Sequence, residues 1–284
     1  MSRAVWLNAA LAAIVVALGI FLYFRPAKDA AIEQPLSGLK PQEVRSLRIE
    51  RARAVPIVLV RKEDTWFIEA PIAARADDAR VMQLLAIVEA RSAHRLPPGN
   101  RERFGLEPPQ ARVIADGQPF SFGLVNDITR EQYVMAGDAI YALHPRYGAA
   151  LPESAVQMAS RRLFGPGEAP ARIALRDFAV EQRDGKWTLA PRAADLSQDD
   201  FIRWVDEWRL ASALRVEPGP AARARDEIRI RLRNGGELTL SVISREPELV
   251  LARSDEKLQY RFGAGLAKRL LSPPAARDEP TGTK

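Results

Sequence analysis

The feature that most constrains this chain is an uninterrupted apolar stretch close to its beginning, residues 5–24, with the sequence VWLNAALAAIVVALGIFLYF. It holds no charged residue. Twenty helical residues rise about 30 Å, which matches the hydrocarbon core of a bilayer. Trp6 and Tyr23 stand near its two ends, where amphipathic rings favour the interface between membrane and water. The sequence therefore predicts a transmembrane anchor over residues 5–24 after a cytoplasmic tail of residues 1–4, and it predicts the lipid bilayer as a partner.

A cleaved signal peptide is the alternative interpretation of this stretch. Its apolar region would be about 7 to 15 residues long and would be followed by a small-x-small cleavage site. Residues 5–24 are longer than that and end in Phe-Leu-Tyr-Phe, so we expect the anchor to be retained. Basic residues flank both ends, so the positive-inside rule does not decide the orientation. A short tail before an anchor favours a single-pass protein of the inner (plasma) membrane, with its C-terminal domain in the periplasm or outside the cell.

Composition narrows the functional classes. The chain has 284 residues and no cysteine, which excludes a lipoprotein and a disulfide framework. With 47% hydrophobic and 27% charged residues, the part after the anchor is expected to be globular. The formal net charge of +6 suits a protein near anionic lipid or polymer, but it is too small for a nucleic-acid-binding surface. We therefore expect no nucleic acid among the partners.

Landmarks that recur at a nearly constant distance indicate an internal duplication. Trp66 and Trp187 lie 121 positions apart, and the turn dipeptides at 116–117 and 234–235, which are typical of β-hairpins, lie 118 apart. In chain order, the predicted segments are a linker (25–42), a first repeat (43–164), a Gly/Pro linker (165–170), a second repeat (171–271) and a disordered tail (272–284). The predicted fold class is α+β, with an N-terminal transmembrane helix followed by two tandem repeats of mainly antiparallel sheet and helices packed on one face.

A set of spaced residues in the first repeat resembles a known family. A Trp-x-Ile-x-x-Pro strand end, an Asp that begins an apolar helix and a later Phe-Gly-Leu-x-x-Pro element are similar to the domain of unknown function 4340. The matching positions are Trp66, Ile68, Pro71, Asp77, Phe104, Gly105, Leu106 and either Pro108 or Pro109. The resemblance covers residues 43–150 well and the second repeat weakly, because the Gly-Leu-x-x-Pro element is missing there. It implies an envelope protein with an N-terminal anchor, often associated with gliding-type ABC export systems, and it carries over no catalytic residue.

Few residues are suited to catalysis or metal binding. A cysteine nucleophile and a Gly-x-Ser-x-Gly elbow are absent, and His94 and His144 are the only imidazoles. His-x-x-His and His-x-x-x-His spacings do not occur, so no metal or other cofactor is predicted. The acidic pairs at 77–78 and 199–200 stand at predicted helix starts, and Ser197 with Asp200 forms a capping-box pattern. These acids are therefore expected to cap helices.

The candidate binding surface is an arginine row, Arg229, Arg231 and Arg233. The three alternate with apolar residues, so a strand would point all three guanidinium groups to one face, about 7 Å apart. Such a row could bind phosphates or carboxylates. The alternative is a solvated face in which the arginines pair with Glu227 or Glu237.

Three functions remain open from the sequence. The first is a non-enzymatic, membrane-anchored extracytoplasmic accessory or scaffold protein, part of an envelope ABC-type transport complex and bound to a membrane-protein partner. The second is a binding module for an anionic envelope polymer or lipid through the arginine row. The third is an enzyme that uses scattered carboxylates. The sequence predicts neither an oligomeric state nor the identity of the partner.

Overall fold

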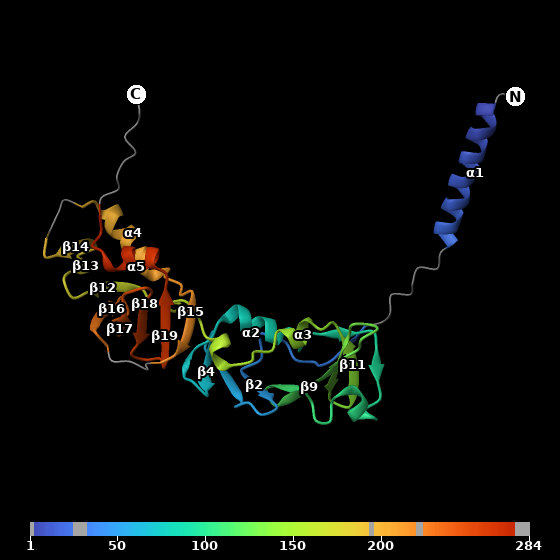
Figure 1. The fold of residues 1–284 in the computed structure, drawn as a ribbon, viewed down its shortest axis with the longest axis horizontal. Coiled ribbons are helices and arrows are strands. Elements are labelled where there is room, and N and C mark those ends of the chain that lie inside the picture. The colour runs from blue at the N-terminus through green and yellow to red at the C-terminus, as the bar shows by residue number, and fades with distance from the viewer. Residues whose placement is uncertain (1–2, 25–32, 193–195, 220–223, 276–284) are drawn as a thin grey trace.

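A computed structural model describes residues 3–24, 33–192, 196–219 and 224–275 (Figure 1). Helix α1 (Arg3–Phe24) is followed by a body built mainly of β-strands. Within the described residues the strands form one two-stranded sheet and two large sheets of nine and eight strands. In Figure 1 the two large sheets follow one another along the long axis of the body.

The first large sheet has the order β5-β4-β3-β2-β8-β9-β10-β11-β7, and its neighbouring strands are antiparallel. Its strands are β2 (Ser46–Arg51), β3 (Ile57–Lys62), β4 (Thr65–Ala70), β5 (Ala74–Arg75), β7 (Arg95–Leu96), β8 (Ala111–Ala115), β9 (Gln118–Val125), β10 (Gln132–Ala136) and β11 (Ala139–Leu143). The short strands β1 (Gln34–Pro35) and β6 (Arg91–Ser92) pair separately. The helical segments of this half are α2 (Asp78–Leu85), η1 (Arg101–Phe104), α3 (Arg146–Ala149) and η2 (Ala155–Met158).

The second large sheet has the order β14-β13-β12-β16-β17-β18-β19-β15 and is also antiparallel throughout. Its strands are β12 (Pro170–Ala174), β13 (Ala179–Arg183), β14 (Lys186–Ala190), β15 (Arg215–Pro218), β16 (Asp226–Leu232), β17 (Glu237–Ser244), β18 (Leu249–Arg253) and β19 (Leu258–Phe262). Helices α4 (Gln198–Arg209) and α5 (Ala264–Leu271) lie together on one side of this sheet (Figure 1). Its strand order matches that of the first sheet from β4 to β7.

The strands form where apolar and polar residues alternate along the sequence, because successive side chains of a strand point to opposite faces. In β16 every second side chain is buried, and Ile228, Ile230 and Leu232 face the core while the residues between them face solvent. The helices cover the core-facing side with apolar stripes, such as Val81, Leu84 and Leu85 of α2. Trp204 and Trp208 of α4 are buried against the second sheet and stack edge to face with ring centroids 6.0 Å apart.

The predicted fold class, α+β with an N-terminal transmembrane helix, is wrong. The body consists mostly of β-sheet, because its helices are few and have four to twelve residues each in the described part of the chain. In the part of the chain that the structure describes, no helix has both the length and the apolar character needed to cross a membrane. The predicted anchor over residues 5–24 is therefore not supported.

Four predicted segments fall partly outside the described residues. They are the tail before the anchor (residues 1–2), the linker (residues 25–32), the second repeat (residues 193–195 and 220–223) and the C-terminal tail (residues 276–284). The linker can still be followed from residue 33. The described end of that linker packs on the first half: Leu36 is buried, its amide donates to the Ala90 carbonyl, and Ser37 Oγ donates to the Val88 carbonyl. The domain boundaries remain predictions.

Candidate functional site

The arginine row lies on the outer, solvent-facing side of the second sheet, opposite the buried side chains of Ile228, Ile230 and Leu232. The Arg229 side chain is 78% exposed and the Arg231 side chain is 48% exposed. The three arginines do not act as one free row. Arg231 Nη2 donates to Glu181 Oε1 at 2.6 Å, whereas Arg229 Nη2 lies 3.6 Å from Glu227 Oε2. The backbone amide of Arg233 donates a hydrogen bond to the Ala169 carbonyl, and among the described residues its side chain makes no hydrogen bond or ion pair.

Glu181 on β13 is the carboxylate that three arginines of this face surround. Besides Arg231 it accepts a hydrogen bond from Arg183 Nη2 at 3.0 Å, and Arg172 Nε lies 3.8 Å from its Oε2. The hydrogen bond from Arg183, followed by that from Arg231, lowers the pKa of Glu181 below its usual range, although partial burial opposes this. Because three guanidinium groups share one carboxylate, two positive charges remain in excess.

The register of three neighbouring strands produces this arrangement. Arg172 on β12 is the cross-strand partner of Glu181 on one side and of Arg231 on the other, so all three side chains emerge on the same face. Arg172 was not identified from the sequence because it lies 59 positions from Arg231. The sequence shows the alternation within one strand but not which strand lies beside it.

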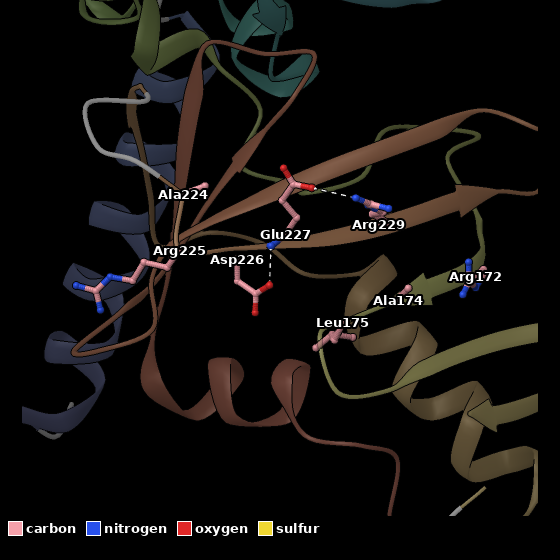
Figure 2. Close-up of a pocket in the computed structure, with 8 residues that line it drawn as sticks. All are labelled: Arg172, Ala174, Leu175, Ala224, Arg225, Asp226, Glu227 and Arg229. Atoms are coloured by element: carbon pink, nitrogen blue, oxygen red, sulfur yellow. Dashed lines mark hydrogen bonds and ion pairs between the residues drawn. The ribbon is translucent and has the colours of Figure 1, made fainter. Parts of the chain in front are cut away.

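A groove of about 560 Å³ adjoins this cluster (Figure 2). Arg172 and Arg225 stand at opposite ends, and Arg229 lies between them beside Glu227. The carboxylate of Asp226 already has two hydrogen-bond donors, the Glu227 amide at 2.9 Å and Arg245 Nη2 at 2.8 Å. We call Arg172, Arg225 and Arg229 the groove arginines.

A second cluster of charged residues lies where the two halves meet. Arg75 on β5 of the first half is 8% exposed, and its Nε donates to Glu256 Oε1 of the second half at 2.7 Å. Its Nη2 donates to the carbonyls of Arg162 and Leu163 and to the Tyr260 hydroxyl. Its Nη1 makes no hydrogen bond and lies 3.8 Å from Glu168 Oε2.

Arg253, whose side chain is 1% exposed, completes the cluster from β18. It donates to both carboxylate oxygens of Glu168 at 2.9 Å and to Asp255 at 2.7 and 2.9 Å. Its Nη1 also reaches the Leu163 carbonyl at 2.5 Å, and the Tyr260 hydroxyl donates to Glu256. We call this cluster the junction network; its members are Arg75, Glu168, Arg253, Asp255, Glu256 and Tyr260.

The junction network shifts the acidity of its members. Burial alone would raise the pKa of Glu168, but hydrogen bonds from Arg253 and the Gly165 amide lower that pKa below the usual range. The pKa of Asp255 is lowered by Arg253 against the same effect of burial. Burial, together with the negative charge of Glu256, raises the pKa of Tyr260. Glu168 and Asp255 are therefore ionised and the Tyr260 phenol is neutral at neutral pH.

A segment between the halves adds backbone bonds to this junction. Residues 158–163 bond to the first half, where the Asp77 amide donates to the Met158 carbonyl and the Ser160 amide donates to the Arg75 carbonyl. The same segment bonds to the second half through the Leu163 amide and the Ala211 carbonyl. Side chains and backbone thus connect the two sheets at one place.

The predicted structural positions are scattered over the body and form no site. Trp66 and Trp187 are core residues of β4 and β14, and Leu106 is buried. Pro71 directly follows β4. Trp6 is 75% exposed, and the side chain of Tyr23 lies outside the described part of the structure.

The predicted caps have local roles. Asp77 caps α2 by accepting from the Arg80 amide at 3.2 Å, and Ser197 and Asp200 form a capping box at α4. Gly105 follows η1 with φ +66°, and a Cβ there would lie 2.5 Å from Leu124 Cγ. His144 Nδ1 accepts from the Arg146 amide. Among the described residues, no group of three His, Cys, Asp or Glu side chains is placed to hold a metal ion.

Comparison with known proteins gives a match to one family. The model of the domain of unknown function family DUF4340 matches residues 66–228, more than half of the chain. No curated protein and no solved structure matches the chain. The matched range runs from Trp66 of β4 to Ile228 of β16 and so includes the junction segment and parts of both large sheets. The chain therefore belongs to the DUF4340 family.

Proposed function

We propose that this protein is a non-enzymatic extracytoplasmic accessory or scaffold protein of an envelope ABC-type transport complex, in which it binds a membrane-protein partner. The observation that carries the proposal is the junction network. A scaffold must hold separate surfaces at a fixed spacing, and a cluster of ion pairs around two buried arginines between the sheets serves that purpose.

The acidity of the junction network supports a structural use of these groups. Strongly shifted pKa values often mark catalytic residues. Here the carboxylates of Glu168, Asp255 and Glu256 are bonded to Arg75 and Arg253, and Arg75 also donates to the backbone carbonyls of residues 162 and 163. The lowered pKa values of Glu168 and Asp255 lie further from neutral pH than the values that suit a general acid or base.

Rigidity between the halves can be measured directly because the chain has no cysteine. Spin labels at Asp127→Cys and Lys186→Cys, exposed positions in the first and second half, report the distance between the sheets. We expect one narrow distance distribution, and a broader one when Glu256→Gln is added. A broad distribution in the otherwise unchanged protein would contradict the rigid scaffold.

The partner can be sought in intact cells. Cross-linking followed by purification of the tagged full chain in mild detergent should recover a subunit of a membrane transport complex. Recovery of the chain alone would count against the proposal. The location is tested separately by an alkaline phosphatase fusion after Lys284, which should be active; an inactive fusion would place the body inside the cell.

A further inference from the structure

We infer that the outer face of the second sheet holds a binding site for a polymer with repeated phosphate groups, seated in the groove between Arg172 and Arg225. This goes beyond the scaffold function and does not depend on it. The site differs from the arginine row expected from the sequence, because Arg231 is bound to Glu181 and is replaced by arginines of neighbouring segments.

The excess of positive charge is the first argument. Glu181 is shared by Arg172, Arg183 and Arg231, so it neutralises only one of three guanidinium groups. It also holds Arg183 and Arg231 in place, because charge-assisted hydrogen bonds restrict the side chains that donate them. The face next to the groove is therefore positively charged and partly ordered before any ligand binds.

The availability of the groove arginines is the second argument. Within the described residues, the Arg225 side chain makes no ion pair or hydrogen bond. The ion pairs of Arg172 with Glu181 and of Arg229 with Glu227 are long, at 3.8 and 3.6 Å. The two acids of the groove, Asp226 and Glu227, face Arg245 and Arg229 respectively. An arriving oxyanion thus meets guanidinium groups whose hydrogen-bond donors are largely free.

The shape of the groove indicates the form of the ligand. It is open to solvent and lies along the sheet, with its arginines at both ends and in the middle (Figure 2). An extended chain with anionic groups at intervals can contact all three, and each phosphate offers oxygens that match the fork of a guanidinium group. A planar membrane surface would contact the rim of such a recess more readily than its floor.

The cavities beside the junction are less suited to an anion. One of them, about 580 Å³, is lined by the carboxylates of Glu69, Glu168, Asp255 and Glu256. Its two cations already have acidic partners: Lys62 lies 3.6 Å from Glu69 Oε1, and Arg75 is bonded to Glu256. A polyanion would meet repulsion there.

The test measures binding of long-chain polyphosphate to the full chain at two salt concentrations. Replacing the three groove arginines together (Arg172→Ser, Arg225→Ser and Arg229→Ser) should weaken binding at least tenfold. The matched control replaces three cations on the outer face of the first sheet (Arg48→Ser, Lys62→Ser and Arg112→Ser) and should weaken binding less than threefold. All six side chains are at the surface or partly exposed, so circular dichroism should show folded variants.

A further variant tests the sign of the effect. Glu227→Gln removes a negative charge from the groove and should strengthen polyphosphate binding, most clearly at low salt. Equal losses in the two triple variants would show that only net charge matters and would overturn the site. Absence of polyphosphate binding, or binding only to vesicles of anionic phospholipid, would overturn the polymer as ligand.

Discussion

The two clusters of arginine and acidic residues in this protein use the same side chains for opposite purposes. At the junction, Arg75 and Arg253 are buried and meet three carboxylates, so the acidic side chains outnumber the guanidinium groups by one. On the outer face of the second sheet, Arg172, Arg183 and Arg231 are partly exposed and share Glu181 alone. Burial and the ratio of charges therefore separate a cluster that joins two halves from one that is available to a ligand.

The physical reason lies in the surroundings of the charges. An exposed ion pair contributes about 0 to 1 kcal/mol, because water solvates the separated partners almost as well. Removing one partner of a buried pair leaves an uncompensated charge and costs about 3 to 5 kcal/mol. The buried pair is costly to break even where replacing both partners together would change stability little.

The largest effect is expected at the junction. Glu256→Ala leaves Arg75 buried without its closest acid and should lower the free energy of unfolding by about 3 to 5 kcal/mol. Urea denaturation followed by tryptophan fluorescence measures the change. Glu181→Ala is the matched control on the surface, and a loss there as large as that of Glu256→Ala would refute the comparison.

An intermediate effect is expected from pH. The pKa of Glu168 is lowered in the folded protein, so the unfolded chain binds its proton first as the pH falls. The stability that Glu168 contributes is complete above its ordinary pKa of about 4.5 and is lost as the pH drops through the lowered, folded value. The difference in unfolding free energy between the native chain and Glu168→Gln should therefore shrink below about pH 4.5. A difference that stays constant down to pH 3 would show that the Arg253 contacts do not act on this acid.

The smallest effect is expected on the outer face. Glu181→Gln keeps the shape of the side chain and removes its charge, and it should change the free energy of unfolding by less than about 1 kcal/mol. Its lowered pKa does not imply a large contribution, because its partners are in contact with solvent. If Glu181→Gln costs several kcal/mol, the face has a structural role and the comparison is too simple.

The sequence alone predicts those features of the fold that depend on residues close to one another along the chain. The alternation around 234–235 matches the pairing of β16 with β17, where Ile230 lies opposite Leu238. The α+β class is wrong because the strands dominate the body, and the periodic apolar segments outside them form helices of four to twelve residues in the described part of the chain. The alternation correctly predicts that Arg229 and Arg231 share one face of a strand, and the alternative pairing with Glu227 is confirmed for Arg229, whereas the partner of Arg231, Glu181, lies on another strand.

Residues brought together from far apart could not be found in this way. Arg75 and Glu256 are separated by 181 positions, and no local pattern marks either one. Arg253 ends an apolar strand and resembles an ordinary strand terminus in the sequence. Only the placement of one sheet against the other shows that these residues meet.

Two double-mutant cycles test the contrast most directly. One combines Arg75→Met with Glu256→Gln, and the other combines Arg231→Met with Glu181→Gln, with the free energy of unfolding measured for every single and double variant. We predict a coupling of about 2 to 3 kcal/mol at the junction and of less than about 1 kcal/mol on the outer face. Equal couplings, or a larger one on the outer face, would contradict the view that burial divides these two clusters into a joint and a binding surface.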